Sequence, residues 1–502
     1  MCTKKKYQKT DLDEVLGKFD LFGRYHMQFM FFIMLAFATN SLYSSNYIFA
    51  AEESGYRCLD EAFANNTCES VEGLRCTELV YDNPRSFVAE FQLGCQEWKR
   101  TLVGTIHSFG YMVGLLIVGP LSDRIGRKKA LVLTGIGGAA LGVAKSFSHS
   151  YWLYIVLEFL ESMIGDSCSP VFILNLEIVT AKKRVIYYCL SGLGYLFGGL
   201  MLPLAAWNVP YWRNFLRAIY APSFLFLAYF FLIDESPRWL LTKGKKDKAI
   251  AILEKMGRKN NVKLDKDALD KLVVEDDGKS IDFLSLLKMT FQSRALLKRC
   301  LVCIVWWTTS TFVNYGIMIN SVSLQGNKYV NYALLQVLDL PGNFLIMYVL
   351  THYKRRNPLI FTFFAAAVLC FCQPFLPDEL PWLSVMVYMI SKLMSSFYFS
   401  ITYIYTSELF PTYTRNSMHA LCSSIGRIGS IIAPQTPLLM VYWSGLPTLI
   451  FGCASLAAGL ATFLVPDTAN DCLPDTVREA EDIGKKKKLT MIGIDNLAMT
   501  KE

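Results

Sequence analysis

The 502-residue chain is poor in charge and in histidine. Charged residues make up only 18% of it, whereas a soluble protein of this length would carry about 25% and would divide into domains joined by polar linkers. The five histidines do not stand at metal-ligand spacing: His26, His107, His149, His352 and His419. The sequence GIGG at 135–138 lacks the strand and phosphate-binding loop of a nucleotide site, and we interpret it as close helix packing. We therefore expect no enzyme, no catalytic residue, no metal and no cofactor.

Long apolar runs dominate the chain instead. Hydrophobic residues make up 53% of it, and runs of about twenty residues recur, each long enough to cross a hydrocarbon core of ~30 Å. Twelve such runs are predicted to be transmembrane helices: 26–50, 101–121, 129–147, 151–179, 185–206, 214–233, 299–320, 330–350, 358–376, 381–405, 417–442 and 446–465. The chain is thus predicted to be an all-α polytopic membrane protein, with the lipid bilayer as a partner and the monomer as its expected state.

The net charge of +8 is distributed unevenly along the chain. Basic clusters fall in every second connection between the apolar runs: 4–6, 123–129, 181–184, 243–299, 353–356 and 485–488. This is the positive-inside pattern, with both termini cytosolic. The basic charge is therefore explained by membrane topology, and we expect no nucleic-acid partner.

The first connection, 51–100, is the one sizeable segment predicted to be extracellular. It carries an even set of four cysteines: Cys58, Cys68, Cys76 and Cys95. It also holds the sequon at Asn65. Disulfides and N-glycosylation both belong to the secretory pathway and the cell exterior, so we predict both here and a plasma-membrane location. Four cysteines allow three pairings, and all three stay open.

The two sets of six apolar runs are related by a weak internal repeat. Glu177 stands at the end of the fourth run and Arg184 follows it, and Glu408 and Arg415 follow the tenth run with the same spacing between acid and arginine. This repeat predicts two six-helix halves with the substrate site near the bilayer midplane. The predicted organisation is a cytosolic N-terminus at 1–25, a first half at 26–233 with its extracellular loop at 51–100, a cytosolic linker with short helices at 234–298, a second half at 299–465 and a cytosolic tail at 466–502.

Several motifs resemble those of a known superfamily. GPLSDRIGRKK at 119–129 resembles the loop signature of the major facilitator superfamily. DESPRW at 234–239, SELFPTYTRNS at 407–417 and the large first loop resemble the organic cation, anion and zwitterion transporter family within it. The stretches 199–222 and 423–434 are similar to carnitine-type members. The resemblance implies alternating access with a cytosolic gate, formed by Asp123, Arg124, Arg127, Glu177, Arg184, Glu235, Arg238, Glu408 and Arg415; YKRRNP at 353–358 departs from the full signature.

Arg427 stands inside an apolar run, where a charge costs several kcal/mol on insertion scales. On a helix it shares a small, polar face with Ser423, Ser430 and Pro434. We predict that it faces the substrate, because a guanidinium suits a carboxylate and stays charged. The alternative is a permanent ion pair with a carboxylate on another span. The resemblance implies arginine at this position in anion and zwitterion carriers and aspartate in carriers of pure cations.

Other polar and aromatic side chains in the second half are predicted to complete the substrate site. Those on 299–350 are Trp307, Asn314, Tyr315, Gln336 and Asp339, and those on 381–405 are Lys392, Phe399 and Tyr403. Trp307 matches a substrate-contacting aromatic of the resembled family, and aromatic faces attract ammonium groups; membrane packing is its alternative role. Lys392 is either a second anion contact or snorkels outward.

Glu158 and Glu161 lie three residues apart on one face of span 151–179. Two carboxylates this close in a low dielectric repel unless one is protonated or a cation lies between them. Glu161 is therefore a predicted substrate contact, with proton coupling and neutralisation of Arg427 as alternatives. For Glu158 a solvated rim is also open.

These observations predict a carrier of small organic ions. The expected substrates are zwitterionic or amine-containing metabolites of the carnitine, betaine or amino-acid-derivative kind. An organic cation transporter and a non-transporting receptor of the same fold are the alternatives. Coupling to Na+ or H+, exchange and uniport all stay open.

Overall fold

The computed structural model describes residues 12–59, 78–165, 168–180, 183–265, 269, 272, 293–352, 355–377, 379–410 and 412–467. The chain forms two compact units, Met1–Gly278 and Lys279–Glu502. Among the described residues, seven helices are long and apolar enough to cross a membrane by length and composition. All twelve predicted spans fall on helices, which confirms the all-α polytopic fold.

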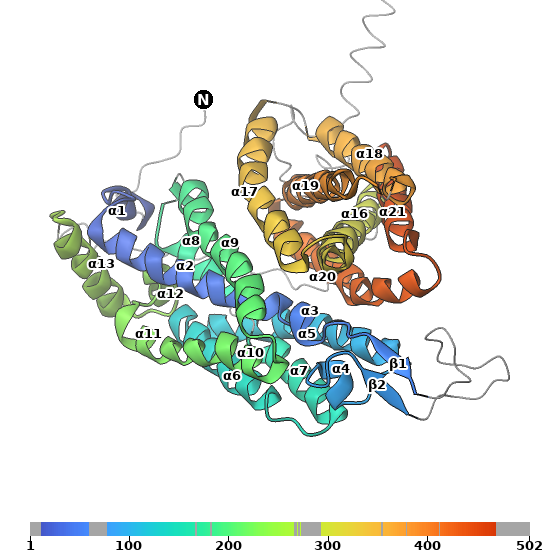
Figure 1. Ribbon diagram of the computed structural model, residues 1–502. Coiled ribbons are helices and arrows are strands. Elements are labelled where there is room, and N and C mark those ends of the chain that lie inside the picture. The colour runs from blue at the N-terminus through green and yellow to red at the C-terminus, as the bar shows by residue number, and fades with distance from the viewer. Residues whose placement is uncertain are drawn as a thin grey trace, which may run out of the picture. The chain divides into compact units, whose positions relative to one another are not determined.

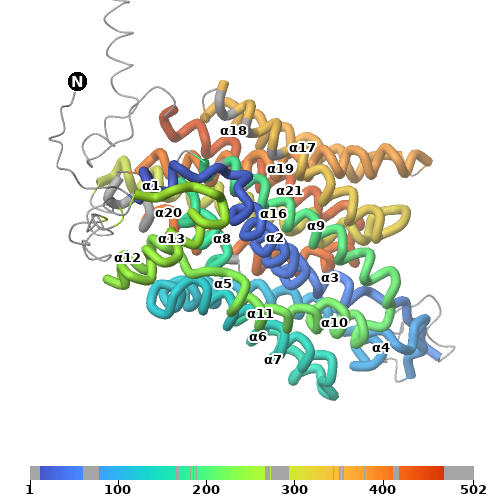
Figure 2. Tube along the Cα trace, turned by 90° about the vertical axis from the view of Figure 1, so that its left-hand side faces the viewer, coloured from blue at the N-terminus to red at the C-terminus, as the bar shows by residue number. Residues whose placement is uncertain are grey.

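In the first unit the six predicted spans correspond to the following helices: α2 (Arg24–Ser45) with α3 (Tyr47–Ala50), α5 (Glu97–Ile125), α6 (Arg127–Lys145), α7 (Tyr151–Gly165) with α8 (Cys168–Glu177), α9 (Arg184–Asn208), and α10 (Trp212–Tyr220) with η2 (Ala221–Leu225) and α11 (Phe226–Leu232). Helices α5, α6 and α7 pack side by side (Figure 1, Figure 2). The close packing predicted for GIGG is confirmed, because a Cβ on Gly138 of α6 would lie 2.7 Å from the Cα of Gly165 on α7.

The predicted extracellular segment contains a short two-stranded sheet. Strands β1 (Tyr56–Cys58) and β2 (Leu79–Tyr81) are antiparallel, with Tyr56 opposite Tyr81, and α4 (Phe87–Glu90) follows. Cys58 and Cys95 are both disulfide-bonded. Cys68, Cys76 and Asn65 lie outside the described residues, so the predicted pairing and glycosylation are not tested.

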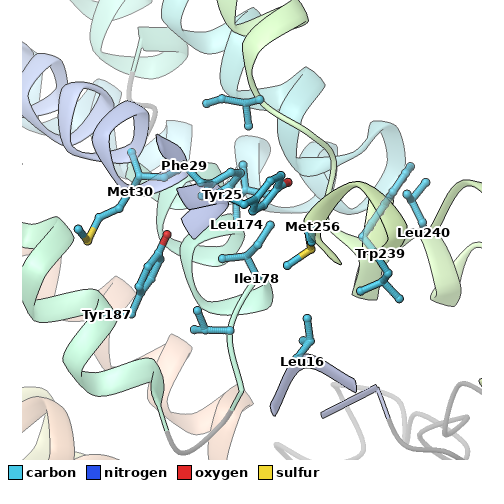
Figure 3. Packing of buried hydrophobic residues seen from close by; sticks show 14 of the residues in the cluster. Leu16, Tyr25, Phe29, Met30, Leu174, Ile178, Tyr187, Trp239, Leu240 and Met256 are labelled. Atoms are coloured by element: carbon cyan, nitrogen blue, oxygen red, sulfur yellow. The ribbon is translucent and has the colours of Figure 1, made fainter. Parts of the chain in front are cut away.

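Short helices with predicted cytosolic positions close one end of the first unit. They are α1 (Leu12–Gly17), α12 (Pro237–Thr242) and α13 (Lys246–Asn260). Leu16, Leu240 and Met256 from these helices join Tyr25 of α2 and Ile178 in one buried cluster (Figure 3). Helix α13 lies in the linker for which short helices are predicted, and its apolar face is buried in this cluster.

The second unit contains the other six predicted spans. They are α16 (Arg294–Asn320) with η3 (Ser321–Ser323), α17 (Lys328–His352), α18 (Arg356–Cys372) with η4 (Gln373–Phe375), α19 (Pro381–Glu408), α20 (Thr412–Ile432) with η5 (Ala433–Val441), and α21 (Leu446–Thr462). Helix α16 packs against α19, α20 and α21, and α17 packs against α19 (Figure 1). Helix α17 continues through Pro341. Residues on α16, α17, α19 and α20 therefore meet inside this unit.

Candidate functional site

Lys392 of α19 lies at the centre of a polar group in the second unit. Its side chain is only 4% exposed, so the alternative that it snorkels outward is wrong. Its Nζ donates to Asn314 Oδ1 at 2.8 Å and to Ser396 Oγ at 3.2 Å, and lies 3.6 Å from Asp339 Oδ2. Ser396 in turn donates to Asp339 Oδ1 at 2.7 Å. Three predicted site residues, from α16, α17 and α19, are thus brought together.

Arg427 of α20 is half-buried and reaches the same helix, α16. Its Nη1 donates to the hydroxyl of Tyr315 at 3.4 Å. Tyr315 follows Asn314 directly, so two consecutive residues of α16 contact the two cations of this unit's predicted site. Asp339 contacts Lys392 and Ser396, which argues against a permanent Arg427–Asp339 pair.

Trp307 is buried within an aromatic cluster. The centroid of its ring lies 5.9 Å from that of Phe399 and 5.6 Å from that of Tyr403, and a ring of His419 lies at 5.2 Å. Its indole N–H donates to Thr406 Oγ1 at 3.1 Å. Tyr403 is half exposed. The cluster contains the three predicted aromatics, and their contact with substrate stays a prediction.

The predicted site residue Gln336 of α17 lies apart from this cluster in its contacts. It is buried and donates to the sulfur of Met318 at 3.8 Å.

Glu161 belongs to a second polar group, which lies wholly in the first unit. Glu158 and Glu161 are both fully buried, so the solvated rim predicted as an alternative for Glu158 is wrong. Both carboxylates accept hydrogen bonds from Lys145 Nζ of α6, at 2.8 Å for Glu158 Oε2 and at 3.1 Å for Glu161 Oε2. His107 Nδ1 of α5 lies 2.8 Å from Glu158 Oε1. We name these four residues the α5–α7 charge cluster.

Lys145 and His107 are not among the predicted site residues. Both lie inside predicted spans, and an ionisable side chain at membrane depth is by default a functional candidate, so this signal was present in the sequence. What the sequence could not reveal is the partner, because Lys145 meets Glu158 only through the packing of α6 on α7. The ligand atoms of His107, Glu158 and Glu161 lie within 4.8 Å of one another, as at some metal sites.

The predicted cytosolic gate of the first half is assembled around Arg127. Its Nη2 donates to Glu177 Oε1 at 3.2 Å, and its Nη1 donates to Asp123 at the end of α5. Glu235 accepts from the backbone N–H of Lys128 at 3.0 Å, near the N-terminus of α6. Gly126 has a φ of 107°, and a Cβ there would collide with the Glu235 carboxylate. A carboxylate at a helix N-terminus is favourable, so Glu235 fixes the start of α6 against the loop.

The other predicted gate residues of this half have separate contacts. Arg238 donates to Asp13 Oδ1 of α1 at 2.7 Å. Arg184 donates to the backbone oxygen of Leu176 at 3.2 Å. Arg124 is exposed. The acid and arginine of the repeat motif, Glu177 and Arg184, are thus neighbours that use different partners.

The second half has a related contact, with a different arginine. Arg355 Nε donates to Glu408 Oε1 at 3.2 Å, and Glu408 is the repeat counterpart of Glu177. Pro358 stands at the position equivalent to Arg127, so Arg355 supplies the charge from one turn earlier. The side chain of Arg415 lies outside the described residues. The departure of YKRRNP from the signature therefore changes the arginine used and keeps an ion pair.

Comparisons with known sequences show which proteins the chain resembles. Residues 19–476 match the family described as "Sugar (and other) transporter". Bovine "Solute carrier family 22 member 1" is 32% identical over 416 residues, which cover 82% of this chain and 73% of that protein. The Drosophila melanogaster "Organic cation transporter protein" is 31% identical over 435 residues, which cover 83% of this chain and 78% of that protein.

Solved structures support the fold alone. A crystal structure of a D-xylose-proton symporter has a TM-score of 0.61 at 15% identity and covers 89% of this chain and all of that chain. An inward-open xylose transporter from E. coli has a TM-score of 0.59 at 16% identity, covering 91% of this chain and all of that chain.

Proposed function

The chain belongs to the family of sugar and other transporters and, within it, to solute carrier family 22, and on this basis we propose that it carries small zwitterionic or amine-containing metabolites across the plasma membrane. It works by alternating access, with both termini in the cytosol. The basic clusters in alternate connections support this orientation. The disulfide-bonded Cys58 and Cys95 support an oxidising exterior for the first loop.

The observation that carries the zwitterion proposal is the pair of cations held by consecutive residues of α16. Asn314 accepts from Lys392, and Tyr315 accepts from Arg427. Asp339 balances one of these two positive charges, which leaves one net positive charge among the three groups. A substrate carboxylate suits this positive site, because the Arg427 guanidinium can bind it through two parallel hydrogen bonds.

The amine end of such a substrate needs a different surface. The ring cluster of Trp307, Phe399 and Tyr403 lies in the same unit and includes the half-exposed Tyr403. An ammonium over an aromatic face gains about 0.5–2 kcal/mol, depending on how far it is desolvated. A carboxylate site and an aromatic site in one half suit a molecule with both charges.

A second candidate is transport of simple organic cations. It is supported by the name of the fruit-fly relative, "Organic cation transporter protein". Asp339 and the α5–α7 charge cluster offer carboxylates for a cation. A third candidate is a receptor of the same fold that binds without transport; the ion pairs of Arg127 and Arg355 favour a carrier, because a breakable lock has no use in a static receptor.

Uptake of two probes separates these candidates. The chain is expressed in cells and supplied with labelled L-carnitine, a zwitterion, or with labelled tetraethylammonium, a cation without a carboxylate. We expect saturable carnitine uptake that exceeds tetraethylammonium uptake. Preferential uptake of tetraethylammonium would replace the zwitterion proposal with the cation candidate. Surface binding of a probe without accumulation inside sealed vesicles would indicate the receptor.

A further inference from the structure

The α5–α7 charge cluster has an unbalanced charge. Lys145, Glu158 and Glu161 are each fully buried, and they bring two carboxylates and one ammonium together. When all three side chains are ionised, their charges sum to one net negative charge. An uncompensated charge away from water is strongly unfavourable, so the cluster needs one further positive charge to be stable.

The hydrogen bonds identify the atom that can receive this charge. Lys145 Nζ uses its three donors on Glu158, Glu161 and, at 3.3 Å, the hydroxyl of Tyr220. Both oxygens of Glu158 are occupied, by Lys145 and by His107. Glu161 Oε2 accepts from Lys145, whereas its Oε1 is buried and has no hydrogen-bond partner in the part of the chain that the structure describes. Glu161 Oε1 is the position left open.

The surroundings of Glu161 select a proton as the occupant. Glu161 and His107 line a small cavity with Asn40 and Tyr111, and the cavity has room for about one water molecule. An organic ammonium ion is too large for it. A metal ion would lie against the Lys145 ammonium, which already binds both carboxylates and would repel it.

Titratable side chains from six helices surround Glu161. These side chains are Tyr43 of α2, Tyr47 of α3, His107 and Tyr111 of α5, Lys145 of α6, Tyr154 and Glu158 of α7, and Tyr220 of α10. The tyrosines are neutral at physiological pH. The negative charge on Glu161 is therefore stabilised by Lys145 and destabilised by Glu158, and His107 is the remaining titratable side chain of the cluster.

We propose that Glu161 binds one exchangeable proton on Oε1 and that the transport cycle is coupled to this proton; the coupling rests on the proposed function. Water in the cavity gives the proton to the carboxylate, which becomes a neutral carboxyl, and takes it back on release. The change in charge acts on α5, α6 and α7 at once, because Lys145 and His107 tie their helices to α7 through the two glutamates. Proton binding therefore biases how these helices pack.

Infrared spectroscopy of the purified full-length chain tests the proton site without any substrate. Difference spectra between about pH 5 and about pH 9 cover the range of pKa values found for buried glutamates in proteins. We expect a protonated-carboxyl band that disappears on alkalinisation in the wild type and is absent in Glu161→Gln. The matched control His107→Gln keeps an amide donor toward Glu158 and should retain the band. An unchanged band in Glu161→Gln, or its loss in His107→Gln, would overturn the assignment to Glu161.

Transport coupling is tested in liposomes that contain a pH-sensitive dye. L-carnitine or tetraethylammonium is added outside, and internal pH and uptake are recorded together. We expect uptake to change the internal pH in the wild type and to leave it unchanged in Glu161→Gln liposomes that still exchange labelled probe. Uptake by the wild type without a pH change would refute the coupling. If neither probe is taken up, the proposed function fails, and the infrared result alone decides the proton site.

Discussion

Arg427 Nη1 and the hydroxyl of Tyr315 are joined by a hydrogen bond of 3.4 Å between α20 and α16. This distance is at the upper end of the range in which such bonds contribute, so the contact is weak. A carboxylate that meets both terminal nitrogens of the guanidinium is a stronger partner than a phenol. Replacing this contact with a bidentate bond to a substrate carboxylate would therefore be favourable.

Substitution of Arg427 tests this role. We expect Arg427→Ala to lower carnitine uptake about 100-fold at normal surface expression, because two charge-assisted hydrogen bonds of about 1.5 kcal/mol each are lost. Arg427→Lys should recover only part of the activity, since an ammonium lacks the planar fork. Arg427→Asp should shift the preference from carnitine toward tetraethylammonium. Carnitine uptake is measured for each variant, and surface biotinylation measures how much protein reaches the surface. Loss of surface protein in all three variants would point instead to a structural ion pair of Arg427.

Lys392 and Asp339 should differ in their importance for stability. The Lys392 side chain is 4% exposed and that of Asp339 is 34% exposed. Lys392→Met leaves the partly buried Asn314 oxygen without this donor, so we expect a loss of about 1–3 kcal/mol in the free energy of unfolding. Asp339→Asn keeps a polar group that water reaches, so we expect the free energy of unfolding to fall by about 1 kcal/mol or less. Thermal unfolding of the detergent-purified variants measures both, and an equal loss would contradict the ranking.

The loop between α5 and α6 depends on a glycine at Gly126. Its φ of 107° and the Glu235 carboxylate beside it both exclude a Cβ, so Gly126→Ala should cost about 1–3 kcal/mol and impair transport. Gly119 provides the matched control, because no atom of another described residue outside its own stretch of helix lies within 4 Å of a Cβ placed there. Gly119→Ala should fold and transport normally. Equal thermal stability of the two variants would show that the turn does not require glycine.

The two carboxylates that hold Arg127 are predicted to contribute unequally to the cytosolic gate. The Glu177 side chain is 15% exposed, whereas that of Asp123 is 65% exposed and screened by water. Asp123→Asn should reach the surface and cycle poorly, and Glu177→Gln should reduce cycling further. Lys129→Ala, at an exposed position outside the predicted gate, is the control and should behave as wild type. Uptake normalised to surface protein decides this, and normal transport by Asp123→Asn would refute its part in the gate.

Glycosidase digestion tests the predicted exterior position of the first loop. We expect the protein from cultured animal cells to migrate faster on a gel after digestion, and Asn65→Gln to remove this shift. Thr67→Ala destroys the same sequon while it keeps Asn65, and it should give the same result. Unchanged mobility of the wild type would contradict glycosylation at Asn65.

The sequence alone determined the helices and their order. A run of about twenty apolar residues has to form a helix in a bilayer because every backbone polar group must be bonded within the segment, so the spans follow from composition. The resemblance of 119–129 to the loop signature also placed Arg127 and Glu177 in one predicted gate, and the structure joins these two side chains in an ion pair. The spans and the gate residues can be predicted because each depends on a short stretch of sequence.

Only the tertiary structure decided which charges meet. The spacing of Glu158 and Glu161 called for a proton or a cation between them, and the packing of α6 on α7 places Lys145 there. The sequence left open whether Lys392 is an anion contact or snorkels outward, and the structure holds it inside through Asn314, Ser396 and Asp339. A buried charge is stabilised by whatever partner the fold places within about 3–4 Å, and that distance depends on helix packing, which no single span encodes.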